Sequence, residues 1–419
     1  MTHDMVELIE WSLAHRTHRK TTDMEPLTEA DAAYRAGDHP RALELYLAAL
    51  AMGRSASTAS LGCGCACDLL GRHEEAQEYF QHVIAAEPEH ALAHRSLGLQ
   101  YLLHGDFSRG WPEYRWHYRT EEFDEKRPQL PPWDGRADGR RIVVVSDQGL
   151  GDALQFARYL PALREHFSEI VFEGDRQLEQ IVTPLVAKFI PTMEAKLHFR
   201  GGYPGAGFEC YTPLSCLPGF FGAGTTETIR APVAIEVPPA LAERARRDHR
   251  LSGGFKVAIA WKGSPGTPRD SIRSLAVDAL GPLLQVPGID FYAISRDLDH
   301  REARYLDDRG VRTFGNSLQS LDWNLLRTAA ILADMRLVIT CDSVIAHLAA
   351  SMGLPTWIAL PFASEWRWRL DMDRSDWYPA ARLYRQTRYG DWTSVVAQMK
   401  HDLIQEVGGP SGGLSDARR

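Results

Sequence analysis

The stretch RIVVVSDQGLGDALQFARYLPAL, residues 141–163, decides the fold of the larger part of this chain. Its apolar run at 141–145 predicts a buried strand, and the apolar residues at 153, 156, 157 and 160 recur at helical spacing. Between the two lies a short turn with Gly149 and Gly151, a residue type that allows tight turns and close approach of other groups. A strand, a tight turn and a helix in this order are the unit from which parallel sheets are built.

The same alternation continues through the rest of the chain. Further apolar runs, with helix-like segments between them, lie at 169–173, 256–261, 289–295, 337–340 and 356–360. They predict two open parallel-sheet α/β domains, at 141–252 and 253–405, with helices on both faces of each sheet. Because ligands of such sheets bind beyond the carboxyl ends of the strands, the loops that follow these runs are the candidate site.

A repeat precedes the α/β part of the chain. Glycines at 37, 71 and 105 each follow the last by 34 residues, and aromatic residues at 46, 80 and 114 keep the same step. This pattern resembles the tetratricopeptide repeat, whose helix pairs stack into an α-solenoid. It predicts a helical domain at 1–126, followed by a linker rich in Pro and Gly at 127–140. Such an array either binds a peptide or protein partner or braces the rest of the chain.

Composition narrows the class of protein. The 419 residues carry a net charge of −8, which argues against a nucleic-acid partner. No apolar stretch approaches the ~20 residues of a membrane span, and acidic residues interrupt residues 1–20, where a signal peptide would be apolar. Six cysteines in a chain of this length indicate no disulfide framework, so we expect a cytoplasmic protein, with a disordered tail at 406–419.

The first strand-end loop carries an acid. Asp152 stands where the helix begins, so it is either an ordinary helix cap or a general base that faces the cleft between the two α/β domains. The loop lacks the lysine of a phosphate-binding P-loop, and an aspartate would repel a phosphate. We therefore assign Gln148, Gly149 and Gly151 to the acceptor side of the site.

The second half contains RLVITCDSVIAHLAASMGLPTWIALPF, residues 336–362. Asp342 and Ser343 are good capping residues for a helix that runs to about residue 352, directly after a buried strand. The backbone N–H groups near Ser343 and Val344 would then hold an anion such as a diphosphate. His347 lies four residues after Ser343 on the same helix face, and it serves either the ligand or the packing of the helix.

Two further segments carry candidates. The stretch AWKGSPGTPRDSIRSL, 260–275, places Lys262, Arg269 and Arg273 on a strand-end loop, where they suit a phosphate ligand or are solvated surface charges. The aromatic stretch 363–379 either forms a pocket wall, with Glu365 and Trp366, or crosses back and anchors on the first α/β domain. We expect no metal or cofactor, because the histidine pair at 90 and 94 lacks a third ligand and the cysteines at 63, 65 and 67 lack metal-site spacing.

Together these segments resemble a family. Gly151-Asp152 with Pro161, and CDSVIAHLAASMGLP at 341–355, look like the heptosyltransferase-type glycosyltransferases, which form glycosyltransferase family 9. Combined with the repeats, QGLGDALQFARYLPAL, AHLAASMGLPTWIALPFASEWRW and DWYPAARLYRQ resemble repeat-bearing bacterial glycosyltransferases, some of which modify flagellin or other proteins. The pair that precedes Gly149, Asp147 and Gln148, is not a heptosyltransferase feature, and neither is the aromatic stretch.

This resemblance implies a GT-B fold, in which two Rossmann-like domains face each other. It implies Asp152 as catalytic base, Arg273 as a contact of the donor diphosphate, and Asp342, Ser343 and His347 as the donor-site helix. The expected function is metal-independent transfer of a sugar from a nucleotide-sugar to an acceptor, which we expect to be a protein held by the repeats. The alternatives are a catalytically inactive adaptor or sugar-nucleotide sensor, and a sugar-nucleotide epimerase of the same fold.

Overall fold

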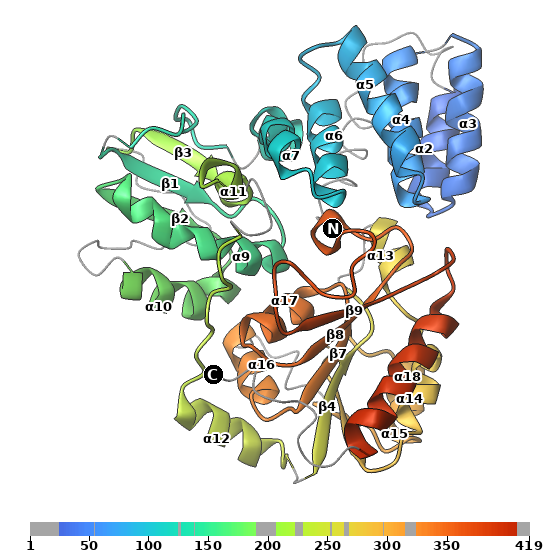
Figure 1. Cartoon of the computed structure of the whole chain (residues 1–419), viewed down its shortest axis with the longest axis vertical. Coiled ribbons are helices and arrows are strands. Elements are labelled where there is room, and N and C mark those ends of the chain that lie inside the picture. Colours follow the sequence, from blue (N-terminus) through green and yellow to red (C-terminus); the bar gives the residue numbers. More distant parts are fainter. Residues whose placement is uncertain are drawn as a thin grey trace.

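The protein is described by a computed structural model, in which three parts follow one another along the chain (Figure 1). The structure describes residues 25–53, 55–124, 127–137, 139–189, 207–222, 229–251, 254–263, 268–295, 297–314 and 324–408. Most of the expected disordered tail, from residue 409 on, lies outside these described residues. None of the described helices has the length and apolarity that a membrane crossing requires.

The first part consists of stacked helix pairs, which confirms the predicted solenoid. The pairs are α2 (Glu25–Arg35) with α3 (His39–Ala51), α4 (Ala56–Leu69) with α5 (His73–Ala86), and α6 (Ala91–Leu103) with α7 (Phe107–Tyr114). Gly37, Gly71 and Gly105 form the turns within the pairs at φ of +80°, +74° and +78°, a region that favours glycine. Small residues let the helices approach each other closely. At Gly64, for example, a Cβ would lie only 2.5 Å from the ring of Phe80, so a larger residue would not fit.

The second part is a small parallel α/β domain. Its sheet has the order β2-β1-β3, formed by β1 (Arg141–Val145), β2 (Glu169–Glu173) and β3 (Cys210–Pro213). The helix expected after β1 is α-helical only over α9 (Leu150–Phe156) and continues as the 3-10 segment η3 (Ala157–Glu165), within which Pro161 supplies no backbone donor. The remaining helices are α10 (Glu179–Phe189), α11 (Leu217–Phe220) and α12 (Pro239–Asp248).

Part of the predicted linker packs against this domain. The Trp133 amide donates to the Tyr211 carbonyl at 2.7 Å, and the Trp133 ring, which is 2% exposed, lies on Phe220 with centroids 4.3 Å apart. At the other end, α12 turns away toward the third part, where Arg246 donates to Asp334 at 2.9 Å (Figure 1).

The third part is a larger parallel sheet with the order β6-β5-β4-β7-β8-β9. Its strands are β4 (Phe255–Ala260), β5 (Ile289–Ala293), β6 (Arg312–Thr313), β7 (Leu337–Cys341), β8 (Thr356–Leu360) and β9 (Ala381–Arg385). The sequence patterns did not predict β6 or β9. In Figure 1, α16 (Leu325–Leu332) and α17 (Val344–Ser351) cover one face of the sheet, and α14 (Gly281–Leu284), α15 (His300–Asp307) and α18 (Trp392–Gly408) cover the other. The short α13 (Pro268–Arg273) follows β4. The structure thus confirms two parallel-sheet α/β domains behind a helical array.

The helix pairs pack on the third part through their turns. A Cβ on Gly71 would lie 2.6 Å from the ring of Phe362, and one on Gly37 would lie 3.1 Å from Oγ of Ser271. Gly105 lies against the guanidinium of Arg369 in the same way. Each of the three periodic turns therefore contacts the second α/β domain, so the array braces that domain.

Candidate active site

The carboxyl ends of the two sheets meet, and the candidate site lies where they do. The helices that follow the two central strands, α9 and α17, pack directly on each other. A Cβ on Gly151 would lie 2.6 Å from Cδ2 of His347, so only a glycine fits at this crossing. This direct contact explains the second glycine of the turn, which brings the two halves of the site within reach of each other.

Asp152 lies in the first turn of α9, three residues after the capping residue Gly149, and is 6% exposed. Its Oδ1 accepts a hydrogen bond from Nη2 of Arg367, so the acid is part of a buried ion pair between the two α/β domains. An opposite charge at this distance stabilises the carboxylate form of an acid. Asp152 therefore lies at the contact between the two α/β domains, where an arginine of the second domain holds its carboxyl group.

The start of α17 carries the predicted anion-binding residues. Ser343 is the capping residue, but its Oγ lies 3.1 Å from Oγ1 of Thr340 and makes no bond to the helix backbone. The preceding Asp342 is 4% exposed. Burial alone would raise the pKa of Asp342, but positive charges, among which are those of Arg367 and Arg273, hold this pKa below its usual value.

His347 is held in place by the segment between β8 and β9 of its own domain. Its Nδ1 lies 2.9 Å from the hydroxyl of Tyr378, and the side chain is 3% exposed. Burial, and then the cation of Arg367, hold the pKa of His347 well below its usual value. The imidazole is therefore neutral at physiological pH, and its orientation is set by the Tyr378 hydroxyl.

The three predicted cations have different surroundings. Arg273, 9% exposed, packs its guanidinium against Gly263 and acts on Asp342, as expected for a residue beside α17. Lys262 lies instead against α15, where its Nζ donates to Glu302 at 2.6 Å. Arg269 forms a buried ion pair with Asp68 of the repeats, so our assignment of this arginine to a phosphate or to solvent was wrong.

Gln148 also differs from the sequence prediction. Its Nε2 donates to the hydroxyl of Tyr114, one of the periodic aromatic residues of the repeats, so the side chain points to the array and not into an acceptor site. The neighbouring Asp147 does the same, because its Oδ2 lies 3.0 Å from Nε2 of His117. Both side chains of this pair therefore fix the β1 loop to the helical part, which accounts for its departure from the heptosyltransferase pattern.

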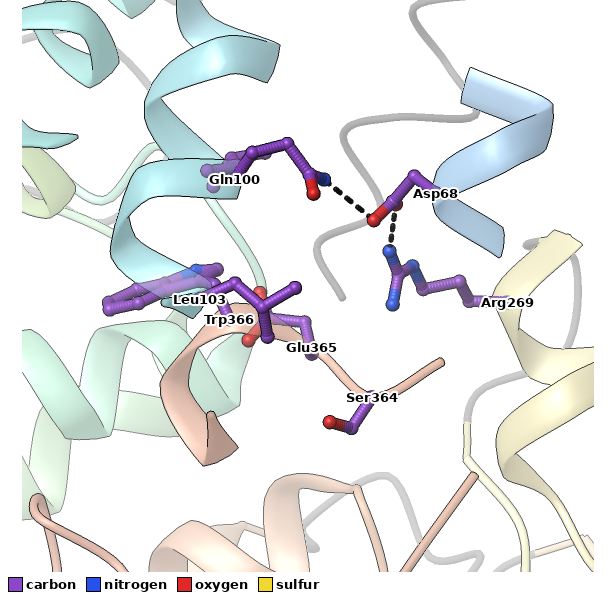
Figure 2. A pocket seen from close by; sticks show the side chains of 8 residues that line it. Asp68, Gln100, Leu103, Arg269, Ser364, Glu365 and Trp366 are labelled. Atoms are coloured by element: carbon purple, nitrogen blue, oxygen red, sulfur yellow. Dashed lines mark hydrogen bonds and ion pairs between the residues drawn. The ribbon is translucent and has the colours of Figure 1, made fainter. Parts of the chain in front are cut away.

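The aromatic stretch joins all three parts of the molecule. The Trp366 ring lies 5.6 Å from that of Trp111 in the repeats and 6.3 Å from that of Phe156 in the first α/β domain. Trp366 and Glu365 do line a pocket, but it lies between the repeats and the second α/β domain and also includes Asp68 and Gln100 (Figure 2). The stretch therefore anchors the domains, as the second interpretation predicted, and the pocket that it lines is not the donor pocket of the first interpretation.

Sequence reasoning missed Arg158, which lies in η3 and is 3% exposed. Its Nη1 donates to the carbonyls of Trp377 and Arg230, at 2.8 and 2.9 Å, and its guanidinium lies over the Tyr378 ring, 4.9 Å from the centroid. Arg158 thus holds the segment that positions His347. An arginine among the apolar residues of FARYLPAL was the only signal in the sequence.

The candidate metal residues have protein partners. Nδ1 of His90 accepts from the Ala93 amide at 3.2 Å and caps α6, while Nδ1 of His94 lies 2.5 Å from a carboxylate oxygen of Glu113. Cys63, Cys65 and Cys67 are buried free thiols, and burial raises their pKa values, to about 12 for Cys63. Among the described residues, no group of three metal-ligating side chains comes together.

Comparison with known proteins supports the helical part directly. A family model described as tetratricopeptide repeat matches residues 27–76 and 70–110. Protein FlbA of Caulobacter vibrioides is 26% identical over 312 residues, which are 70% of this chain and 52% of that protein. The chain therefore spans about half the length of this curated relative.

Among solved structures, similarity extends to glycosyltransferases. A family 9 glycosyl transferase from Veillonella parvula is 14% identical, with a TM-score of 0.43 over 64% of this chain and 96% of that one. ADP-heptose LPS heptosyltransferase II from E. coli is 11% identical, with a TM-score of 0.41 over 64% and 99%. An O-GlcNAc transferase mutant from Thermobaculum terrenum is 14% identical, with a TM-score of 0.29 over 95% and 96%. The family match covers residues 27–110 of this chain, which belong to the tetratricopeptide repeats.

Proposed function

We propose that the protein is a glycosyltransferase that moves a sugar from a nucleotide-sugar to an acceptor hydroxyl. The observation that carries this proposal is the meeting of two unlike half-sites. The first α/β domain contributes a carboxylate, Asp152, and the second contributes the start of α17 with Arg273 beside it. A base on one side and an anion-binding region on the other are the groups that a displacement at a sugar–phosphate bond requires.

The mechanism is a single displacement. Asp152 takes the proton of the acceptor hydroxyl while the oxygen of that hydroxyl forms a bond to the anomeric carbon. At the same time the bond from the anomeric carbon to the diphosphate oxygen breaks. The nucleoside diphosphate leaves with the electron pair. We assign its stabilisation to Arg273 and to the backbone N–H groups of Ser343 and Val344. The neutral His347 borders the same space, and we propose that protein groups alone supply this charge, without a metal ion.

The repeats favour a protein as the acceptor. Solenoids of this kind present extended surfaces to macromolecules. The edge of the array that carries the glycine turns at Gly37, Gly71 and Gly105 is covered by the second α/β domain. An acceptor protein must therefore bind elsewhere on the array and reach Asp152 across the β1 loop, which the repeats hold through Tyr114.

The proposal is tested with the full-length protein and a panel of nucleotide-sugars with adenine, uracil, guanine and thymine bases. We expect one nucleotide to raise the melting temperature, and its sugar conjugate to be slowly hydrolysed with release of the nucleoside diphosphate. Arg273→Gln should weaken that binding about tenfold or more, because a hydrogen bond to a charged group is lost. Asp371→Asn, in an exposed loop, is the control that should change nothing.

The same panel separates the alternatives. Binding without any release of diphosphate, in the presence of candidate acceptor proteins, would favour the adaptor or sensor. Conversion of the sugar to a stereoisomer would favour the epimerase. Failure of every nucleotide to bind would contradict the transferase proposal itself.

A further inference from the structure

The side chain that pairs with Asp152 has no role in the mechanism above. Arg367 lies in the short segment between β8 and β9, and it is 2% exposed. Its Nη2 donates to Asp152, and its Nη1 lies 2.9 Å from Oε2 of Glu365. Its Nε is buried as well, and among the described residues it has no hydrogen-bond acceptor. A buried donor without an acceptor is unfavourable, so this position calls for a further anionic or polar group.

The sheet topology places Arg367 beside the start of α17. Strands β4, β7 and β8 are neighbours in the sheet, so the loops that follow them leave from the same edge. Arg273 comes from the first of these loops, Asp342 and Ser343 from the second, and Arg367 from the third. The cations of Arg273 and Arg367 both act on Asp342. Two arginines therefore border the backbone N–H groups to which we assign the diphosphate.

The other basic side chains of this edge have partners elsewhere. Lys262 is held by Glu302 at 2.6 Å, and its Nζ also donates to the Asp297 carbonyl at 2.5 Å. Arg269 is held by Asp68 of the repeats. Arg367 pairs with the Asp152 carboxylate and keeps a buried Nε without a hydrogen-bond acceptor in the described part of the chain, as Arg273 and Arg269 do at their own Nε atoms.

We infer that Arg367 is the second arginine of the diphosphate site, and that it exchanges the Asp152 carboxylate for the diphosphate when a nucleotide-sugar binds. This inference rests on the proposed function. An arginine fork suits both partners, because carboxylates and phosphates accept the same pair of parallel N–H donors. The exchange frees the Asp152 carboxylate for the acceptor hydroxyl only after the donor is in place. Glu365 stays bonded to Nη1 and keeps the guanidinium at the cleft throughout.

The exchange predicts opposite effects for its two members. We expect Arg367→Gln to weaken the binding of the preferred nucleoside diphosphate about tenfold or more, since charge-assisted bonds to the phosphates are lost. Asp152→Asn should strengthen that binding about threefold or more, since the competing charge is gone while the size of the side chain is kept. Titration calorimetry with ADP, UDP, GDP and inorganic pyrophosphate measures both. The corresponding nucleosides, which lack phosphates, should bind the variants and the parent equally.

Matched variants separate this role from a structural one. Arg369→Gln removes the same charge two residues away, where the arginine pairs with Asp376 at 3.1 Å, and it should leave diphosphate binding within about twofold. Arg367→Lys keeps a charge but not the fork, and it should fall between the parent and Arg367→Gln. If Arg367→Gln does not fold, the direction of the Asp152→Asn effect still decides the question.

Each outcome has one meaning. Equal diphosphate binding by the parent and Arg367→Gln, or weaker binding by Asp152→Asn, overturns the exchange and leaves the transferase proposal standing. If the parent binds none of the four probes, the proposed function fails and takes the exchange with it. Opposite shifts in the two variants support the assignment of Arg367.

Discussion

Two buried pairs of aspartate and arginine hold this molecule together, and they differ in the charged groups that surround them. Asp68 of the repeats binds Arg269 of the second α/β domain and also accepts from Gln100 at 2.7 Å (Figure 2). Asp152 of the first α/β domain binds Arg367, and in the described part of the chain the Nε of Arg367, like that of Arg269, has no hydrogen-bond acceptor. Both arginines sit in a buried interface between domains, so their burial alone does not distinguish them.

The surroundings of each pair indicate its role. Around Asp68 the partners Arg269 and Gln100 come from two different parts of the molecule and fix their arrangement, and breaking a buried pair of this kind is strongly destabilising. Around Arg367 there are three carboxylates, of Asp152, Glu365 and Asp342, and the fork has a choice of partner. Burial opposes the charge on Arg367, but the carboxylates, with Glu365 first, outweigh burial and raise its pKa. One pair is therefore a structural bond between domains, and the other belongs to the site.

The largest expected effect tests the Asp152 pair. Asp152→Asn should reduce sugar transfer, or donor hydrolysis, by about 10²- to 10⁴-fold, because a positioned general base contributes that much. The rate of nucleoside diphosphate release measures the loss. Asp147→Asn, on the same loop but turned toward His117, is the comparison and should act mainly on stability. Full activity of Asp152→Asn would remove the difference between the two pairs.

The next effect tests the Asp68 pair. Asp68→Ala should lower the free energy of unfolding by about 3–5 kcal/mol, because it leaves the buried Arg269 without its counter-charge. Chemical denaturation measures the loss, and nucleotide binding by the folded fraction should be retained. The double variant Asp68→Leu with Arg269→Met should recover most of the lost stability. If the pair contributed little to stability, the parent, Asp68→Ala and the double variant would all have the same free energy of unfolding.

A third effect concerns pH at the same interface. Burial, and then the cation of Arg269, lower the pKa of His39 to about 4 from 6.5. Between these values the unfolded chain binds a proton that the folded chain does not, so stability should rise with pH from about 4 to 6.5. The slope corresponds to a difference on the order of 3 kcal/mol across this range. Denaturation of His39→Phe at several pH values should show a flatter profile, and an unchanged slope would contradict the assignment.

The smallest effect tests the glycine turns. Gly71→Ala should cost about 1–2 kcal/mol for the left-handed backbone, and more because its Cβ would lie 2.6 Å from Phe362. Gly53→Ala is the matched control, since Gly53 has a φ of +66° and nothing within 4 Å of its would-be Cβ. The difference between the two melting temperatures isolates the contact with the second α/β domain. Equal losses would mean that Phe362 moves aside freely.

Local patterns in the sequence predicted much of this molecule. The period of the glycines predicted the helical array, and apolar runs predicted β1, β4, β7 and β8. Strand β9 was missed, because arginines alternate with its apolar residues and it follows a long aromatic stretch. Local patterns are sufficient where each element is specified by its own residues.

Contacts between distant residues could not be predicted in this way. Arg367 and Asp152 are 215 positions apart, and Arg269 and Asp68 are 201 apart. Each arginine lies in a segment whose sequence would equally suit a solvated surface. Its aspartate partner comes from another domain, so the pairing appears only when the domains are packed together. The same holds for Gln148, whose partner in the repeats decides its direction.

The three glycine turns also limit how this chain can vary in length. Gly37, Gly71 and Gly105 are interchangeable within the array, but their neighbours Ser271, Phe362 and Arg369 are unlike one another. A duplication that inserted one more helix pair between Gly71 and Gly105 would move Gly37 one step beyond Ser271 and carry Asp68 away from Arg269. Descendants of this gene are therefore expected not to gain repeats between these turns, because each such insertion would break a match to the second α/β domain.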